Sequence, residues 1–350
     1  MTQGRGRFIP LLLLLFLGGA ACGGGTEVDP AAMESTTEVE REEDAPEGAA
    51  DELLTQLTEH ANYEFEASVF VFEGGELEFA GPLDRRYSFD SITKTMTALL
   101  LADLLATEEL DLVTPVGEIL DAGRNAEITL LQLATHTSGL PETADNWDQW
   151  EGFTDEQPYA GYTADMAETA LEMAELDEDA GYSNFGFQIL GLCVEKVGED
   201  TLGGLARHQI FEPAGMSTAD IPVGERGLPD GLLDGEPVPA WNNLLTGDGG
   251  AGGTIADLAA YAEFMLDPPA DSAAAVDIAT TAHIQHDDGD ASGLAWFIPS
   301  EGLLSHAGAS DAYNSMIVLD PDAGTAAGYL TATGDLDDEA VDLFLDYLAA

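Results

Sequence analysis

Strand-like segments stand at both ends of the globular part of the chain, and this order most constrains what the chain can fold into. Residues 66–72 are rich in β-branched and aromatic side chains, and the turn 73–76 joins them to a second short apolar run. Near the C-terminus, residues 313–319 and 325–331 flank a turn rich in Asp, Pro and Gly. We therefore expect one antiparallel sheet whose strands come from both ends of the chain.

The segments between these hairpins carry apolar side chains at helical spacing. The clearest are residues 91–106, 184–197 and 254–266, and residues 337–348 close the chain with the same pattern. The sequence thus predicts an α/β fold of the α+β kind, in which helices flank the antiparallel sheet.

Acidic side chains outnumber basic ones by 67 to 10, which gives a formal net charge of −57. Nucleic acid is a poor partner for such a chain, because phosphate binding needs clustered Lys and Arg. With 45% hydrophobic residues the chain can nonetheless bury a core. Dispersed surface carboxylates keep a protein hydrated in concentrated salt. We therefore expect a saline habitat; an acidic proteome without special salt tolerance is the alternative.

Residues 1–21 have the three parts of an export signal. Two arginines precede an apolar stretch at 8–17, and small residues lead to Cys22. The apolar run is about half of the ~20 residues that a membrane-spanning helix needs. Cys22 stands where a bacterial lipobox has its lipidated cysteine. Gly19 replaces the usual Leu of that motif, so cleavage after Ala21 without a lipid is the alternative.

Residues 22–59 are rich in acids and poor in aromatics, a composition that cannot offset the entropy of ordering. We expect a flexible tether there and a globular domain at 60–350. The leucines of 51–60 stand at helical spacing and leave open an earlier start of the domain. Cys193 lies among apolar residues of a predicted helix, so we expect it in the core and no disulfide.

Ser91 and Lys94 stand three residues apart at the start of a predicted helix. At this spacing the two side chains share one face, so the lysine amine can take the serine proton. The helix N-terminus adds positive potential that stabilises a developing oxyanion. The plain alternative is a serine that caps the helix and a lysine on the surface.

Two further short stretches carry groups suited to the same chemistry. Tyr182 can exchange protons with a neighbouring lysine and Asn184 can hold a substrate amide, although a turn with an Asn helix cap explains both residues. His306 precedes Gly308, which lets a substrate lie against the strand, and the N–H of Ala309 can help to hold an oxyanion. An ordinary loop histidine is the alternative here.

Taken in order, the motifs Ser-x-x-Lys, Tyr-x-Asn and His-x-Gly resemble those of the serine hydrolases related to class C β-lactamases and D-alanyl-D-alanine carboxypeptidases. The resemblance covers about residues 60–350. The longer stretches that look like this family are 89–94, 128–141, 182–192, 210–216 and 251–258. The resemblance implies a β-lactamase/transpeptidase-like fold, with an antiparallel sheet, an inserted mainly helical region and a cleft between them.

The same resemblance implies a mechanism. Ser91 would attack a carbonyl to give an acyl-enzyme that water then hydrolyses, while Lys94 and Tyr182 would move protons. The backbone N–H groups of Ala309 and Ser91 would hold the oxyanion, and no metal or cofactor is required. The residues assigned in this way are, for catalysis, Ser91, Lys94, Tyr182, His306 and Ala309, and, for substrate binding, Asn184 and Gly308.

The third motif departs from the β-lactamase pattern, which has lysine at the position of His306. A histidine has an ordinary pKa near ~6.5 and is mostly neutral at pH 7. The globular part has only seven basic residues, and none follows Arg226. Neutral esters or amides therefore fit better than a substrate carboxylate, unless Arg124 or Arg226 folds into the cleft.

Other groups of residues give weaker signals. No G-x-S-x-G elbow is present, which argues against an α/β-hydrolase. His283 and His286 lie near acids, but their spacing is unlike the helix pair of zinc proteases, so we expect no metal there. We expect His136 to bond backbone rather than to catalyse. Trp147 and Trp150 could line the mouth of the cleft or pack in the core.

The sequence as a whole predicts an exported serine hydrolase that acts on a small-molecule ester, amide or peptide. It would be lipid-anchored through Cys22 in the cell or outer membrane, or periplasmic or secreted without the lipid. A D,D-carboxypeptidase or weak β-lactamase acting on wall peptides is the enzymatic alternative. A noncatalytic surface-binding lipoprotein is the other, although a dead enzyme has no chemical reason to keep Ser91, Lys94 and Tyr182 together.

Overall fold

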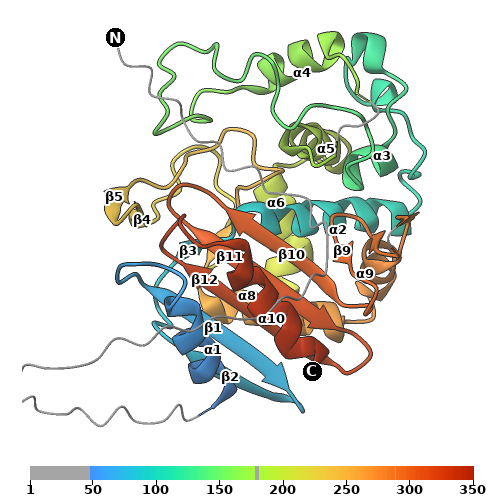
Figure 1. The fold of residues 1–350 in the computed structure, drawn as a ribbon. Coiled ribbons are helices and arrows are strands. Elements are labelled where there is room, and N and C mark those ends of the chain that lie inside the picture. The colour runs from blue at the N-terminus through green and yellow to red at the C-terminus, as the bar shows by residue number, and fades with distance from the viewer. Residues whose placement is uncertain (1–47, 178–180, 288) are drawn as a thin grey trace, which may run out of the picture. The chain divides into compact units, whose positions relative to one another are not determined.

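The computed structural model describes residues 48–177, 181–287 and 289–350. The predicted export signal, Cys22 and most of the predicted tether lie outside these residues. In the described part, a short N-terminal hairpin is followed by a long, mainly helical stretch and then by strands that return to the hairpin (Figure 1). None of the helices in this part is long and apolar enough to cross a bilayer.

The compact unit begins earlier than the predicted start at residue 60. Helix α1 (Ala49–Thr58) follows Gly48 directly and buries Leu53 and Leu57 against the sheet. Apolar side chains at helical spacing explain this, because the helix gains stability from the apolar surface that it covers. The predicted tether therefore ends before α1.

One sheet of eight strands runs through the molecule in the order β2-β1-β12-β11-β10-β9-β8-β7. All neighbouring strands are antiparallel, and the N-terminal hairpin joins the rest through β1 and β12, with Ala67 opposite Thr331. This confirms the prediction of one antiparallel sheet built from both ends of the chain. The strands are β1 (Ala67–Glu73), β2 (Glu76–Ala80), β7 (Ile284–Gln285), β8 (Ala291–Ser292), β9 (Phe297–Ile298), β10 (Leu304–Ala309), β11 (Asn314–Asp320) and β12 (Thr325–Thr331).

The remaining elements surround this sheet. Two small sheets pair β3 (Tyr87–Ser88) with β6 (Gly252–Gly253) and β4 (Gly231–Leu233) with β5 (Glu236–Val238). The other helices are α2 (Thr93–Ala106), α3 (Leu130–Ala134), α4 (Ala164–Met173), α5 (Asn184–Gly198), α6 (Leu202–Ala206), α7 (Glu212–Ala214), α8 (Ile255–Leu266), α9 (Ala273–Thr280) and α10 (Asp338–Ala349). Short turns of other helical types are η1 (Asp90–Ile92), η2 (Val116–Glu118), η3 (Gly123–Asn125) and η4 (Arg207–Phe211).

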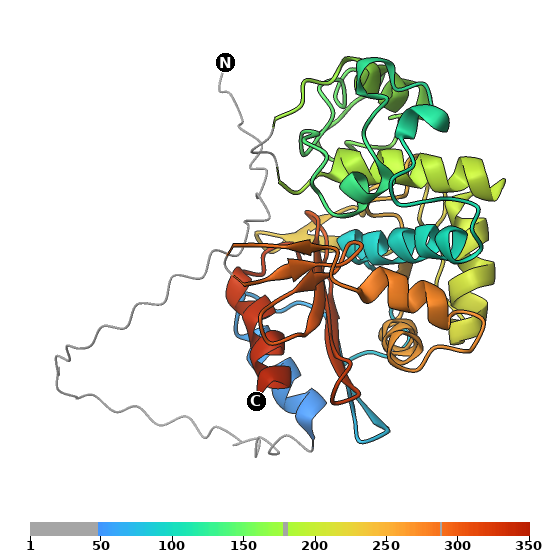
Figure 2. The same cartoon turned by 90° about the vertical axis from the view of Figure 1, so that its right-hand side faces the viewer.

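Each face of the sheet has its own hydrophobic core. The side chains of β1 alternate, so that Val69 and Val71 belong to one cluster and Phe70 to the other. On the first face α1 and α10 cover β1, β11 and β12, and on the second α8 packs directly on the same strands. Figure 2 shows the sheet almost edge-on, with α1 and α10 on one side and α2, α8 and α9 on the other.

The helical region between α2 and α5 shares the second core. Leu130 and Leu133 of α3 and Leu171 of α4 lie in the same buried cluster as Phe185 and Leu190 of α5. Cys193 lies in this cluster too, as its apolar neighbours predict. The inserted region that the family resemblance implies is therefore packed against the helix that starts at Asn184.

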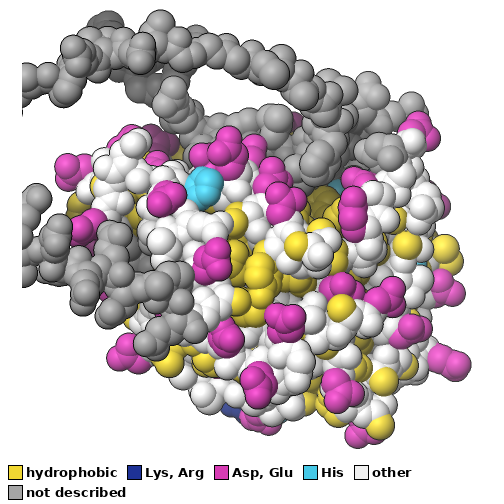
Figure 3. Space-filling view, turned by 60° about the horizontal axis from the view of Figure 1, so that its bottom comes forward, with side chains coloured by type: hydrophobic (Ala, Val, Ile, Leu, Met, Phe, Trp, Pro, Cys, Tyr) yellow, Lys and Arg dark blue, Asp and Glu magenta, His cyan; other side chains and the backbone are white. Residues whose placement is uncertain are grey.

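The surface carries the acidic excess in a dispersed form. Figure 3 shows Asp and Glu side chains scattered over one face, separated by apolar and neutral ones, and almost no Lys or Arg. Several basic side chains of the described residues are paired with acids, among them Arg85 with Glu66 and Arg86 with Asp220.

Candidate active site

Ser91 lies in a tight turn, η1, directly before α2. Its neighbour Asp90 has a φ of +44°, which is unusual for a residue with a side chain. The backbone N–H of Asp90 donates to the Ser88 hydroxyl at 3.1 Å, and that hydroxyl donates to the Asp90 carboxylate. Strained backbone of this kind persists where surrounding contacts fix it. The turn thus holds Ser91 at the start of the helix.

A buried pair of opposite charges lies behind this turn. Asp90 also accepts a hydrogen bond from Ser310 at 3.1 Å, and Arg226 donates to the Ser88 hydroxyl at 2.9 Å and to the Ala251 carbonyl. Burial raises the pKa of Asp90, and the nearby Arg226 charge opposes this shift. Arg226 is 5% exposed and is engaged by the groups that hold the turn. It therefore supports the serine turn from behind.

Lys94 is fully buried and has three hydrogen-bond partners. Its Nζ lies 3.0 Å from Ser91 Oγ, 2.8 Å from Asn184 Oδ1 and 2.7 Å from the Asp248 backbone oxygen. Two of these partners can only accept, whereas the serine hydroxyl can also donate. A neutral amine can therefore donate its two hydrogens to the two acceptors and direct its lone pair at the serine proton. The alternative of a surface lysine is wrong.

The residues before α5 bring a phenol and an amide to the same lysine. Ser183 caps the helix, because its hydroxyl accepts from the Gly186 N–H at 2.9 Å. Asn184 is thus the first residue of the helix rather than its cap, and its side chain is free to bind Lys94. The ring centroid of Tyr182 lies 5.0 Å from Lys94 Nζ. Its hydroxyl is buried and bonds none of the described residues.

Strand β10 packs its glycine against the serine turn. A Cβ atom at Gly308 would lie 2.8 Å from the Ser91 nitrogen and 2.7 Å from the Phe89 oxygen, too close for any other residue. The two amides that the family resemblance assigns to the oxyanion, those of Ser91 and Ala309, therefore belong to segments in direct contact. This contact explains the need for glycine in the third motif.

His306 on β10 is buried and neutral. Its Nδ1 lies 2.7 Å from the Ala307 carbonyl, so Nδ1 carries the hydrogen and Nε2 is left as an acceptor. Burial lowers the pKa of His306 to about 3, and the Lys94 charge acts in the same direction. Nε2 is buried and bonds none of the described residues. The loop alternative is wrong, because His306 lies within a strand and its ring centroid is 6.4 Å from that of Tyr182.

His136 holds the other side of the tyrosine. Its Nδ1 accepts from the Ser183 N–H at 3.0 Å, which agrees with the expectation of a backbone bond. Its ring also stacks on Tyr182, with centroids 4.3 Å apart. Burial lowers the pKa of His136 well below its ordinary value, and the Lys94 charge adds to this. No sequence pattern predicts this stacking.

Phe297 completes an aromatic group around the tyrosine. Its ring centroid lies 5.4 Å from His306 and 6.5 Å from Tyr182, and the side chain is partly exposed. It comes from β9, and a strand of two residues is too short to show an alternating pattern in the sequence. An exposed aromatic ring thus lies beside those of His306 and Tyr182.

A family model described as Beta-lactamase matches residues 66–350. The chain belongs to this beta-lactamase family. Its fold and its relatives connect it with β-lactamases and penicillin-binding proteins.

Two curated relatives of this beta-lactamase family member share part of its length. Penicillin-binding protein 4 of Amycolatopsis lactamdurans is 27% identical over 206 residues, which are 53% of this chain and 51% of that protein. The D-alanyl-D-alanine-carboxypeptidase/endopeptidase AmpH of Escherichia coli K12 is 29% identical over 144 residues, 38% of this chain and 36% of that protein. The chain thus matches about half or less of the length of these relatives.

Solved structures with the same fold are more distant in sequence. The octameric penicillin-binding protein homologue from Pyrococcus abyssi has a TM-score of 0.69 and 20% identity, and covers 85% of this chain and 76% of its own. The class C beta lactamase from Rhodobacter sphaeroides has a TM-score of 0.71 and 16% identity, and covers 86% of this chain and 99% of its own. At such identities the likeness shows the fold alone.

The residues that gave weaker signals lie apart from this group. His283 bonds the Ile278 carbonyl and His286 bonds the Ser292 hydroxyl, each at 2.8 Å through Nε2. Trp147 and Trp150 pack edge-to-face on the same ring, Phe153, at 5.1 and 6.0 Å. These tryptophans form a small aromatic cluster in the helical region, which favours the packing interpretation. Among the described residues, the acid-rich group that could hold a cation is His60 with Asp337 and Glu339, on the opposite face of the sheet.

Proposed function

We propose that this protein hydrolyses an ester or amide through an acyl-Ser91 intermediate. The observation that carries the proposal is the buried Lys94 amine, 3.0 Å from the Ser91 oxygen and held by two obligate acceptors. A lysine without solvent contact and with its hydrogens committed elsewhere is arranged to accept the serine proton. A surface-binding protein would have no use for this arrangement.

The reaction would begin when Ser91 Oγ attacks the substrate carbonyl carbon and its proton passes to Lys94 Nζ. Backbone N–H groups of Ser91 and Ala309 would stabilise the negative oxygen that forms. Tyr182, whose hydroxyl has no other partner among the described residues, would give its proton to the leaving group and take back from Lys94 the proton that came from Ser91. Water would then attack the acyl-enzyme and give a proton to Lys94, which would return it to the departing Ser91 oxygen.

A neutral substrate fits the third motif better than a carboxylate does. His306 presents an uncharged nitrogen as an acceptor, so it favours a group that donates an N–H or O–H and opposes a carboxylate. The second candidate is a D,D-carboxypeptidase or a weak β-lactamase, and the relatives named as a penicillin-binding protein and a D-alanyl-D-alanine-carboxypeptidase support it.

The first test asks whether Ser91 is acylated. The protein is treated with a fluorophosphonate and with a penicillin-type probe, and its peptides are analysed by mass spectrometry. We expect a label on Ser91 that is absent from Ser91→Ala. A folded protein that takes up neither probe would favour the noncatalytic binding protein.

The second test ranks substrates. Rates are compared for p-nitrophenyl esters, for nitrocefin and for a peptide ending in D-Ala-D-Ala. We expect the highest kcat/KM for an uncharged ester. Turnover of nitrocefin or the peptide alone would replace the neutral-substrate proposal by the second candidate.

We also propose that the enzyme works outside the cytoplasm, anchored through a lipid on Cys22, and in a saline medium. The support is the sequence alone, namely the basic and apolar segments before Cys22 and the charge of −57. Mass spectrometry of the mature N-terminus tests the first point. Melting temperature from low to molar salt tests the second, and a flat curve would reject it.

A further inference from the structure

Asp248 touches the candidate base through its backbone, and its carboxyl group is buried beside it. The carbonyl accepts from Lys94 Nζ at 2.7 Å, and the residue is 7% exposed. One carboxyl oxygen accepts from Gln188 Nε2 at 3.2 Å, and the other bonds none of the described residues. A buried carboxylate with unmet hydrogen-bonding capacity is costly unless a cation lies near.

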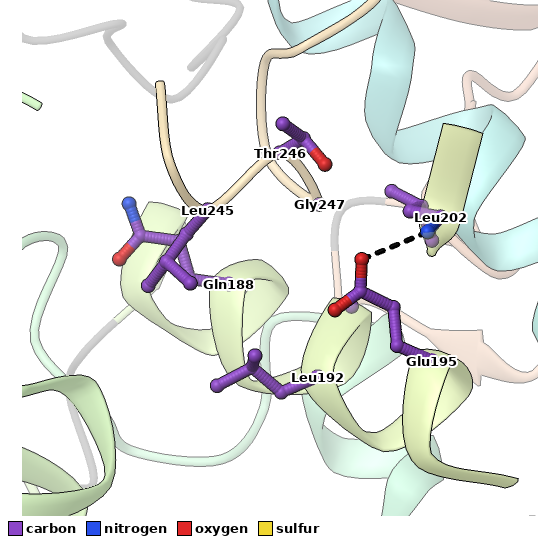
Figure 4. A pocket seen from close by; sticks show the side chains of 8 residues that line it. Gln188, Leu192, Glu195, Leu202, Leu245, Thr246 and Gly247 are labelled. Carbon is purple, nitrogen blue, oxygen red and sulfur yellow. Dashed lines mark hydrogen bonds between the residues drawn. The ribbon is translucent and has the colours of Figure 1, made fainter. Parts of the chain in front are cut away.

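The side of Asp248 that faces α5 offers no cation. Gln188 lines a small pocket between α5 and the loop of residues 245–247 (Figure 4). The one charged group of this pocket is Glu195, which accepts from the Leu202 N–H at 2.8 Å. Tyr159 also lies within electrostatic range of Asp248, and it carries no positive charge. Burial raises the pKa of Asp248, and among the described residues the positive charge that opposes this shift is that of Lys94.

Lys94 has a second acid within range, but another cation also acts on that acid. The Arg226 charge acts on Asp90, whose carboxyl group also accepts from two serine hydroxyls. The remaining groups around Lys94 are the Tyr182 ring and two histidines, His136 and His306, whose pKa values burial lowers. Asp248 is thus the acid that has Lys94 as its only positive neighbour within the described part of the chain.

The distance allows a strong interaction. The carboxyl carbon of an aspartate lies within roughly 4.5 Å of its own backbone oxygen, so here it lies within about 7 Å of Nζ. At such a separation inside a protein, one unit charge shifts the titration of another by roughly one to two pH units. The coupling acts equally in both directions.

We propose that Asp248 is a positioning residue for Lys94: its carbonyl holds the amine against Ser91, and its carboxylate, as the counter-charge, sets the pH at which the amine loses its proton. The inference rests on the proposed function. A protonated Lys94 would have to release one proton to solvent before it could accept that of Ser91. The rising limb of the pH profile then reports the pair of Lys94 and Asp248 rather than the lysine alone.

The pH profile of Asp248→Asn tests this, because asparagine keeps the backbone contact and the size of the side chain. We expect the rising limb of kcat/KM to move down by about one pH unit, so that below the wild-type midpoint the variant is up to about tenfold faster. A merely structural role for the carboxyl would slow the enzyme at every pH. Asp103→Asn is the matched control, since Asp103 lies on the same helix as Lys94 but about 13 Å further along it, and its limb should not move.

A direct measurement uses the scarcity of lysine. The chain contains two lysines, Lys94 and Lys196, so a protein labelled with ¹³Cε-lysine gives two signals, and Lys196→Arg assigns them. We expect the Lys94 signal of Asp248→Asn to titrate about one pH unit lower than in the wild type. Gln188→Arg, which offers the carboxylate a second cation, should shift it the same way if Asp248→Asn does not fold.

The outcomes separate this inference from the proposed function. Lys94 signals that titrate at the same pH in the wild type and in both variants would overturn the role of Asp248, even in an active enzyme. A shifted Lys94 signal in a protein that takes no label on Ser91 would keep the electrostatic pair and reject the hydrolase.

Discussion

The two faces of the sheet are covered by helices in a similar way but bury different chemistry. On the face of α1 and α10 the buried side chains are mostly apolar, with Leu57, Val69, Met316 and Phe344 at the centre. The buried polar ones there, such as Asn314 and Thr331, are uncharged. On the other face the buried residues include charged ones. Those among the described residues are Asp90, Lys94, Arg226, Asp248 and Asp257.

The difference teaches where this chain tolerates buried charge. Each charge removed from water is costly unless a partner replaces the lost hydration. On the second face the partners exist: Lys94 has three, and Asp90 lies beside Arg226. Charges that serve stability alone are easily replaced by apolar groups, so their concentration around one serine indicates chemistry. The first face is then scaffold, and its substitutions should affect folding without affecting rate.

The largest effect is expected at Ser91. Ser91→Ala removes the atom that forms the covalent bond, so turnover should fall by about 10⁴-fold or more. The free energy of unfolding should change by less than about 1 kcal/mol, because only one partly exposed hydroxyl is lost. Steady-state rates and urea unfolding check the two halves of this prediction. A variant with near-normal turnover would refute the nucleophile.

A substitution on the first face should have the converse effect, lowering stability rather than rate. Phe344 is fully buried and packs on Tyr329, with ring centroids 5.0 Å apart. Phe344→Ala should lower the free energy of unfolding by about 3–5 kcal/mol through lost burial and the cavity that it leaves. The kcat/KM of the folded fraction should stay the same at a temperature where the variant is folded. A large drop in that value would erase the proposed division between the faces.

Replacing Lys94 is expected to lower the rate less than replacing Ser91. Without the amine, Lys94→Ala leaves the serine proton to water or to Tyr182, so the acylation rate should fall by about 10²-fold or more. Lys196→Ala is the natural control, because it removes the only other lysine and that residue is exposed on α5. Single-turnover labelling of Ser91 measures the effect. Equal rates in the two lysine variants would contradict a role for Lys94 as base.

The parts of this picture that the sequence could predict are local ones. Turns with glycine at positive φ mark the hairpins, as at Gly74 and Gly75, with φ of +61° and +81°. Long apolar segments mark α2, α5, α8 and α10, and α2 is buried on all sides rather than on one face. The pairing of Ser91 with Lys94 follows from one helical turn, and the structure brings the two side chains together as that spacing predicts.

The parts that escaped prediction depend on contacts between distant segments. The bond from Lys94 to the Asp248 carbonyl joins residues 154 positions apart, and any residue type can supply a carbonyl. Strands β7, β8 and β9 have two residues each, too few for an alternating pattern, so Phe297 gave no signal. The family resemblance implied that the three motifs lie close together in space, because no local spacing could establish this.

The smallest expected effect is a pH dependence of the free energy of unfolding, which comes from a histidine on the second face. The unfolded chain binds a proton at His306 below about pH 6.5, whereas the folded chain does so only near a pKa of about 3. Between these values the unfolded state holds more protons, so the stability that neutral His306 preserves at pH 8 is progressively lost as the pH falls. His136 acts in the same direction, and the raised pKa values of Asp90 and Asp248 act in the opposite one.

A variant isolates the histidine from these other groups. His306→Asn cannot titrate, so between pH 8 and pH 5 the wild type should lose about 2 kcal/mol more stability than the variant does. Urea unfolding at the two pH values measures the difference, and the shifts of His136, Asp90 and Asp248 cancel because both proteins carry them. His208→Asn, at an exposed site on η4, should follow the wild type. If His306→Asn also follows the wild type, His306 can take up a proton in the folded protein. Solvent then reaches the second face of the sheet, which is not sealed as its buried charges require.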